Sequence, residues 1–232
     1  MSTTILGIDI GSSKICAIIA EKNDDDGKRY FDKAYGLENT DQTKAHYANW
    51  ASIYDKEVNE EKGYQQPKRC AEALIASDIS RDGLILDVGC GTGLSGMALR
   101  VAGFSNIEGC DLSPEMLAQA AKTNAYQRLF ETNLNEPPLD APDSHYDAAA
   151  CVGVFSFGHV KPAAIDKILR VLKPQGILVI GLNDHFYDEG EFPAKLDALV
   201  AEGKITILSR SHGAHLANVE GSTGWVINSR KI

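Results

Sequence analysis

The sequence predicts an α/β domain in which helices cover a mostly parallel sheet. The first observation is an apolar run, residues 84–88, bounded by glycines and typical of a strand buried on both faces. The second is a helix-period pattern that begins at Leu94, continues to Val101 and stops at Gly103. The third is the repetition of this strand-and-helix alternation along the rest of the chain.

Length and composition narrow the class of protein. The chain has 232 residues, enough for one α/β domain with a sizeable core. Its net charge of −9 argues against a general binder of nucleic acid or anionic membranes. Five scattered cysteines without a C-x-x-C pair predict reduced, mostly buried thiols in a cytoplasmic protein, and no metal site. No apolar stretch reaches membrane-spanning length, and Asp9 interrupts the N-terminal apolar run, which makes a poor signal peptide.

The central motif follows the first sheet strand. Three alternate glycines, Gly89, Gly91 and Gly93, allow a sharp turn and the close approach of a ligand. The helix start offers unpaired N–H groups to an anion. Residues 91–96 fit the G-x-G-x-x-G string of nicotinamide and flavin enzymes. The longer string 87–93, DVGCGTG, has an acid before the glycines and resembles motif I of the class I S-adenosylmethionine-dependent methyltransferases.

This resemblance implies which part of the cofactor the glycine turn binds. It implies that the methionine part of S-adenosylmethionine lies on Asp87, Gly89, Cys90, Gly91 and Gly93. The cofactor carboxylate would meet backbone N–H groups near the helix start, and Asp87 would steer the backbone.

The second strand, residues 106–111, ends on Asp111. A carboxylate at that position can accept hydrogen bonds from both ribose hydroxyls of an adenosine. Enzymes of the nicotinamide class share this feature, so it does not separate the two classes. Ser113 is expected to cap the next helix, and Leu112 and Met116 to flank the adenine.

The third strand, residues 128–134, ends on Asn133 and Leu134. The resemblance implies that both border the adenine, at a place where the family often has an acid. The amide oxygen of Asn133 can accept the same hydrogen bond from the adenine amino group, without the charge. A turn-forming role for Asn133 is an equally good interpretation.

The fourth strand, residues 146–154, carries the expected substrate side at its end. In open α/β sheets the ligand crevice lies outside the carboxyl ends of the strands. Phe155, Phe157 and His159 are therefore the expected substrate-side groups. His159 is also the candidate catalytic base, because histidine titrates near neutral pH. The alternative is that His159 packs beside the following helix.

The second half of the chain is expected to supply the remaining strands of the sheet. An amphipathic helix at 162–172 leads into residues 172–176, LKPQG, and an apolar strand, which resembles the helix-to-fifth-strand junction of the same family. A helix follows at 192–202, and residues 204–211 and 224–229 are the expected last strands. The resemblance implies a seven-stranded, Rossmann-like sheet whose last strand is inserted between the fifth and sixth, a hairpin that nicotinamide domains usually lack.

An aromatic helix is expected before the sheet, in residues 40–61. Tyr47, Trp50, Ala51 and Tyr54 share one face, and a core-facing role is expected for Trp50. The string resembles the Y-x-x-W-A-x-x-Y-D leader of small bacterial methyltransferases and their animal relative from the Williams–Beuren region. That resemblance implies a helical lid in which Tyr54 reaches the cofactor, where a ring facing a sulfonium makes a cation–π contact.

The N-terminal segment is predicted to be a separate unit. Residues 1–21 form two apolar segments with a small polar turn, which predicts a β-hairpin. It resembles the first phosphate hairpin of actin-like ATPases, but no second phosphate motif follows, so an extra hairpin or fusion remnant is expected. Residues 22–34 are predicted to be a charged linker, and 35–232 the methyltransferase domain.

The function expected is transfer of a methyl group from S-adenosylmethionine to a small-molecule acceptor by in-line displacement. The protein is expected to be a monomer or homodimer without nucleic-acid or membrane partners. Three alternatives stay open: a nicotinamide- or flavin-dependent oxidoreductase, a non-catalytic S-adenosylmethionine-binding module, and an assembly protein driven by the hairpin.

Overall fold

A computed structural model describes residues 4–11, 14–21, 40–136, 138–156 and 160–232, the first two ranges as backbone. The expected linker and the expected substrate-side residues Phe157 and His159 lie outside these ranges. None of the described helices combines the length and apolar character needed to cross a bilayer.

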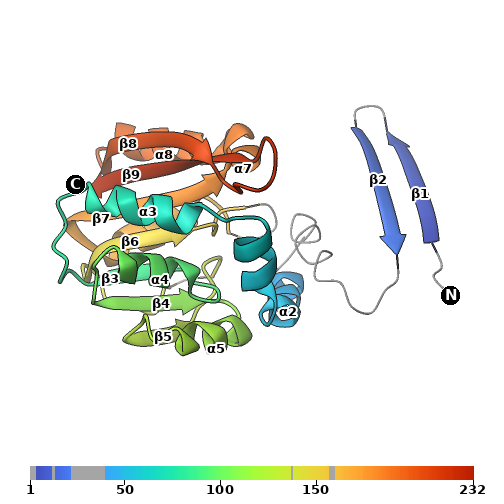
Figure 1. Cartoon of the computed structure of the whole chain (residues 1–232). Coiled ribbons are helices and arrows are strands. Elements are labelled where there is room, and N and C mark those ends of the chain that lie inside the picture. The colour runs from blue at the N-terminus through green and yellow to red at the C-terminus, as the bar shows by residue number, and fades with distance from the viewer. Residues whose placement is uncertain (1–3, 12–13, 22–39, 137, 157–159) are drawn as a thin grey trace.

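The main sheet has seven strands in the order β5-β4-β3-β6-β7-β9-β8 (Figure 1). The first five in this order run parallel, whereas β9 is antiparallel to both of its neighbours. The expected seven-stranded sheet, with its last strand inserted between the fifth and sixth, is therefore confirmed. The strands are β3 (Ile85–Val88), β4 (Ile107–Asp111), β5 (Arg128–Glu131), β6 (Tyr146–Val152), β7 (Leu172–Asn183), β8 (Ile205–Ala214) and β9 (Thr223–Lys231).

Helices cover both faces of this sheet (Figure 1). Helices α3 and α4 pack on one face, and α6 and α8 pack on the other. The helices are α2 (Thr40–Trp50), the π-helix η2 (Asp55–Glu61), α3 (Gln66–Ile75), α4 (Leu94–Val101), α5 (Pro114–Lys122), α6 (Ala164–Val171), α7 (Asp184–Asp188) and α8 (Glu191–Ala201).

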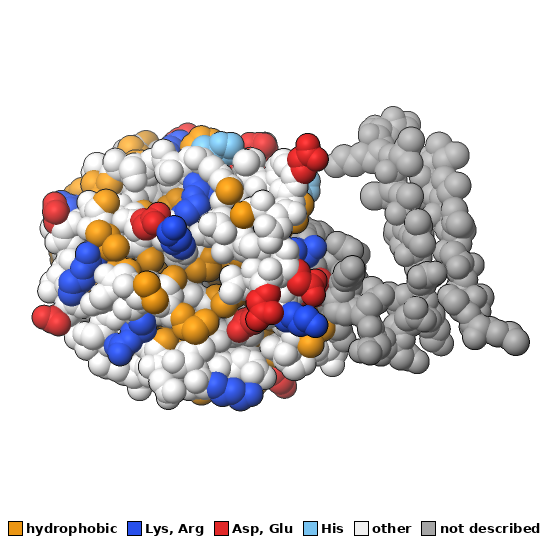
Figure 2. Space-filling view, in the orientation of Figure 1, with side chains coloured by type: hydrophobic (Ala, Val, Ile, Leu, Met, Phe, Trp, Pro, Cys, Tyr) orange, Lys and Arg blue, Asp and Glu red, His pale blue; other side chains and the backbone are white. Residues whose placement is uncertain are grey.

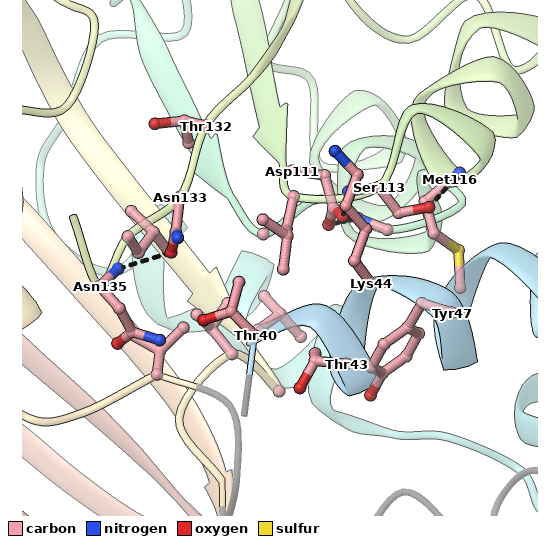
Figure 3. Close-up of a pocket in the computed structure, with 18 of the residues that line it drawn as sticks. Thr40, Thr43, Lys44, Tyr47, Asp111, Ser113, Met116, Thr132, Asn133 and Asn135 are labelled. Carbon is pink, nitrogen blue, oxygen red and sulfur yellow. Dashed lines mark hydrogen bonds between the residues drawn. The ribbon is translucent and has the colours of Figure 1, made fainter. Parts of the chain in front are cut away.

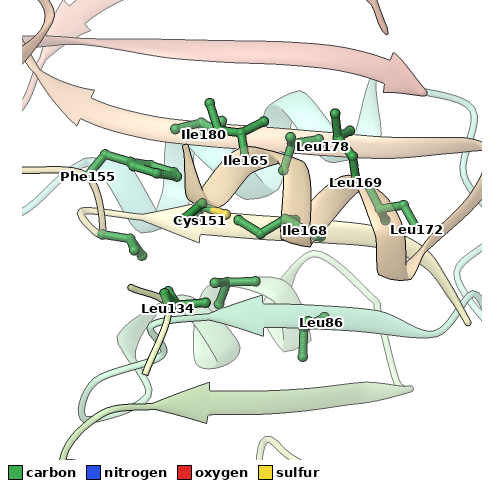
Figure 4. Close-up of a cluster of buried hydrophobic side chains, with 14 of the residues drawn as sticks. Leu86, Leu134, Cys151, Phe155, Ile165, Ile168, Leu169, Leu172, Leu178 and Ile180 are labelled. Atoms are coloured by element: carbon green, nitrogen blue, oxygen red, sulfur yellow. The ribbon is translucent and has the colours of Figure 1, made fainter. Parts of the chain in front are cut away.

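Strand β3 divides the core in two. Its side chains alternate between faces, so Leu86 and Val88 join the cluster under α6 and α8, shown in Figure 4. Ile85 joins the second cluster, under α3 and α4. All four residues of β3 are buried, which confirms the expected strand buried on both faces.

Two predicted strands are shorter than expected. Strand β5 ends at Glu131, because Asn133 then forms a turn by accepting a hydrogen bond from the Asn135 N–H. Strand β6 ends at Val152, because Gly153 takes a φ of +71° that strand geometry does not allow. Both shortened ends lie at the edge of the sheet where ligands bind in open α/β folds.

The prediction of a single helix in residues 40–61 is wrong in one respect. The α-helix ends at Trp50, and the chain resumes as the wider η2. Trp50 is 2% exposed, packs near Val58 and donates its Nε1–H to Glu57 Oε2 at 2.7 Å. The core-facing role expected for Trp50 is therefore confirmed.

The N-terminal segment forms the expected β-hairpin. Strand β1 (Thr4–Gly11) pairs antiparallel with β2 (Lys14–Glu21). This pair is a separate two-stranded sheet and adds no strand to the seven-stranded one.

Candidate functional site

A pocket lies at the carboxyl edge of the parallel strands, with α2 forming one wall (Figure 3). Its cavity volume is about 110 Å³, and the pocket opens to solvent. The lining consists of Thr40, Thr43, Lys44, Tyr47, Tyr54, Gly89, Gly91, Asp111, Leu112, Ser113, Met116, Thr132, Asn133, Leu134, Asn135, Val152, Gly153, Val154 and Val160.

The glycine turn presents its backbone to this pocket. Gly91 has a φ of +53°, and a Cβ added there would meet no atom within 4 Å. Its open side therefore faces the pocket that it lines. Gly89 has a φ of +66°, and a Cβ there would lie 2.6 Å from Val154 Cγ2. A side chain at Gly89 is thus excluded by space as well as by backbone conformation.

Asp111 is anchored by the backbone. Its Oδ2 accepts a hydrogen bond from the Gly91 N–H at 2.9 Å, and its Oδ1 accepts from the Ser113 N–H at 2.9 Å. Burial raises the pKa of this carboxyl, while the amide hydrogen bonds act in the opposite direction. An ionised carboxylate offers about four acceptor sites, so accepting capacity remains for a ligand hydroxyl.

Another wall of the pocket combines apolar side chains with the side-chain amide of Asn133. Leu112, Met116 and Leu134 line the pocket. Asn133 also lines it, and its Oδ1 accepts the Asn135 N–H at 3.0 Å, the dashed line in Figure 3. Both interpretations of Asn133, turn former and pocket residue, therefore describe its position.

Helix α2, in the segment expected to be a lid, supplies a wall through four residues that were not among the expected site residues. Thr40, Thr43, Lys44 and Tyr47 all line the pocket (Figure 3). Their spacing of i, i+3, i+4 and i+7 places them on one helix face, a signal that was available in the sequence. Lys44 forms an ion pair with Glu131, which joins α2 to the end of β5.

A second contact joins the N-terminal helices to the glycine turn. The Thr92 hydroxyl donates a hydrogen bond to the Asp55 carboxylate. Tyr54, the neighbour of Asp55, lines the pocket. The leader segment and the glycine turn are thus attached to each other at the site.

Three residues of the expected cofactor set lie behind the pocket. Asp87 is fully buried and points to the α4 face, where it accepts hydrogen bonds from Ser95 Oγ at 2.6 Å and the Tyr126 hydroxyl at 2.7 Å. Burial raises its pKa to about 6. Cys90 is a buried thiol, and Gly93 is the N-cap of α4. None of these three residues lines the pocket, and their expected part in cofactor binding, with Asp87 steering the backbone of the turn, stays a prediction.

One expected substrate-side group is also corrected. Phe155 is 1% exposed, and its ring centroid lies 5.3 Å from that of Phe192 in α8. The chain after β6 turns this ring into the hydrophobic core, where burial of a phenyl group is favourable. Val160 lines the pocket from the same connection.

The fold and pocket define a Rossmann-like α/β protein with a ligand site at the carboxyl edge of its sheet. Residues 85–176 match the family described as "Methyltransferase domain". Phosphatidylethanolamine N-methyltransferase of Cereibacter sphaeroides is 31% identical over 168 residues, which cover 68% of this chain and 76% of that protein. Human methyltransferase-like protein 27 is 38% identical over 149 residues, covering 63% of this chain and 60% of that protein.

The chain belongs to the class I S-adenosylmethionine-dependent methyltransferases. It spans about 60% of the length of the human relative. A TehB-like SAM-dependent methyltransferase structure from Corynebacterium glutamicum superposes with a TM-score of 0.57 at 22% identity. That superposition covers 81% of this chain and 99% of the other, and it supports the fold.

Proposed function

We propose that this protein transfers the methyl group of S-adenosylmethionine to a small-molecule acceptor. The observation that carries the proposal is the junction of the glycine turn with Asp111, through the hydrogen bond from the Gly91 N–H. The turn offers open backbone to the pocket, and the carboxylate offers acceptor sites beside it. Both features suit S-adenosylmethionine, because its carboxylate can accept hydrogen bonds from backbone N–H groups and its ribose hydroxyls can donate to a carboxylate.

The lining fits this cofactor. Asp111 would hold the ribose, and Leu112, Met116 and Asn133 would border the adenine. Gly89 and Gly91 would carry the methionine part, and Tyr54 would place its ring near the sulfonium. When bound, S-adenosylmethionine supplies a methyl group that is already activated by its positive sulfur.

The residues of the chain then have two tasks, which are to align an acceptor and to exclude water. Helix α2 closes one side of the pocket with Thr43 and Tyr47, and the backbone at Gly153 and Val154 closes another. Alignment of this kind supplies roughly 7–11 kcal/mol of a reaction barrier. His159 stays a candidate base for an acceptor that must lose a proton.

Product analysis tests the proposal. The protein is incubated with S-adenosylmethionine and fractionated small-molecule extracts, and the products are followed by mass spectrometry. Formation of S-adenosylhomocysteine together with an acceptor that has gained one methyl group supports the proposal. Tight binding of the cofactor without turnover in any fraction would favour the non-catalytic binding module instead.

A further inference from the structure

Tyr126 lies behind the pocket, in the connection between α5 and β5, and is not part of the lining. Its hydroxyl donates a hydrogen bond to Asp87 Oδ2 at 2.7 Å and accepts one from the Gly96 N–H at 3.1 Å. Ser95 Oγ donates to the same Asp87 oxygen at 2.6 Å. One phenol thus joins the acid of β3 to the first turn of α4, the two elements that flank the glycine turn.

Two glycines make room for this ring. A Cβ at Gly96 would lie 2.3 Å from the Tyr126 hydroxyl oxygen, and a Cβ at Gly109 would lie 2.9 Å from its ring. Neither position tolerates a side chain while Tyr126 keeps its place. Gly96 is also the residue that completes the G-x-G-x-x-G string. The contact with Tyr126 accounts for this glycine without a dinucleotide ligand.

The acid at the centre of this network carries its charge in an apolar setting. Burial raises the pKa of Asp87 to about 6, and the hydrogen bonds from Ser95 and Tyr126 oppose that rise. Burial also raises the pKa of Tyr126 far above neutral, so its hydroxyl remains a donor. The other titratable groups that interact electrostatically with Asp87 are Asp111 of β4 and the thiols of Cys70, Cys90, Cys110 and Cys151, which burial keeps neutral.

We propose that Tyr126 is a positioning residue of the cofactor site, which holds the glycine turn in its binding conformation without touching the ligand. The proposal rests on the proposed function, because the ligand is S-adenosylmethionine or its product. Without the hydroxyl, the Gly96 N–H and Asp87 each lose a partner and the turn populates other conformations. Apparent affinity then falls in proportion to the fraction that remains competent to bind.

The test compares Tyr126→Phe with Tyr146→Phe in the full chain. Tyr146 is a matched control, because it is buried and donates to the Glu108 carboxylate at 2.7 Å, on the β6–β4 side away from the turn. Calorimetric titration with S-adenosylhomocysteine should show about tenfold weaker binding for Y126F, the equivalent of one charged hydrogen bond. Y146F should bind like the wild type.

The pH dependence separates positioning from a general loss of stability. Wild-type affinity should fall as the pH decreases through the pKa of Asp87, since protonation removes the charge that Tyr126 and Ser95 stabilise. Y126F should move this fall to higher pH, because a hydrogen bond that lowers the pKa of Asp87 is lost. The difference between the two proteins isolates Asp87 from Asp111, which has no hydrogen bond to Tyr126.

Gly96→Ala provides a second variant, because its Cβ displaces the same hydroxyl while the tyrosine remains. It should weaken binding and shift the pH profile in the same direction. Wild-type affinity and an unchanged pH profile in either variant overturn the assignment of Tyr126. Failure of the wild-type protein to bind S-adenosylhomocysteine would contradict the proposed function instead, so the two failures are distinguishable.

Discussion

Asn133 shows how one short side chain can serve both the fold and the site. Its amide oxygen stabilises the turn after β5 by accepting the Asn135 N–H, while the residue lines the pocket. The carbonyl oxygen has a second lone pair, so the turn does not exhaust its accepting capacity. An acidic residue here would keep the turn and add a charge.

Substitutions at Asn133 should separate these two roles. Asn133→Asp keeps an acceptor for both bonds and should retain the affinity for S-adenosylhomocysteine within about threefold. Asn133→Leu keeps the bulk but loses the acceptor, and should bind about fivefold more weakly, as expected for one neutral hydrogen bond. Calorimetry provides the measurement. Equal affinities for the Leu variant and the wild type would show that Asn133 serves only as a wall.

At the scale of elements, two contacts of unequal value attach the N-terminal helices to the domain. The Lys44 and Glu131 side chains are 41% and 48% exposed, and such exposed pairs contribute about 0–1 kcal/mol. Thr92 is only 2% exposed, and its hydrogen bond to the Asp55 carboxylate is shielded from water on that side. A hydrogen bond to a charged group contributes about 1.5–3 kcal/mol, so the Thr92 contact dominates.

Unfolding in urea should reveal this difference. Thr92→Val keeps the shape of the side chain but removes the donor, and should lower the free energy of unfolding by about 2 kcal/mol. Thr92→Ser retains the hydroxyl and serves as the control. Glu131→Gln should cost less than about 0.5 kcal/mol. A larger loss for the Glu131 variant than for Thr92→Val would reverse this ranking.

Sequence patterns predicted the sheet well because its signals are local. The apolar run before the glycines and the helix period after them define β3 and α4 without other information. The break after Trp50 was not predictable in this way, because the aromatic spacing continues through Tyr54 while the backbone widens into η2.

Side-chain direction beyond a strand end was harder to predict. The chain leaves β6 at Gly153, and whether Phe155 then faces ligand or core depends on Phe192, which is distant in sequence. Asp87 faces α4 by the alternation of β3, but no local pattern indicates its hydrogen bond with Tyr126.

At the scale of the whole molecule, the domain boundary is a prediction. In the part of the chain that the structure describes, β1 and β2 pair with each other and form a sheet separate from the seven-stranded one. A protein that begins at residue 35 should therefore unfold within about 2 °C of the full chain, a change below 1 kcal/mol at this size. It should also bind S-adenosylhomocysteine equally well. A large loss in melting temperature would place the hairpin within the folded core.

A buried histidine should make stability depend on pH. His215 is 7% exposed, and burial, with a smaller contribution from Arg69, lowers its pKa to about 4. The unfolded chain binds this proton near pH 6.5, so the contribution of His215 to stability is lost as the pH falls from about 6.5 to 4. The full change is on the order of 3 kcal/mol. Asp87, whose pKa is raised, acts in the opposite direction between about pH 4 and 6.

Comparison of His215→Gln with the wild type isolates the histidine, because Asp87 is common to both proteins. The variant should lose less stability between pH 6.5 and 4 in denaturant titrations, whatever its stability at neutral pH. Parallel curves for the two proteins would show that His215 titrates as it does in the unfolded chain.

The central claim is that the glycine turn and Asp111 form a site for S-adenosylmethionine. Calorimetric titration of the purified protein with S-adenosylmethionine, S-adenosylhomocysteine and NADH tests it most directly, with Asp111→Ala as the control. The account predicts micromolar binding of both sulfur ligands, loss of that binding in the variant, and no binding of NADH. Binding of NADH alone would contradict the account and favour the dinucleotide reading of the G-x-G-x-x-G string.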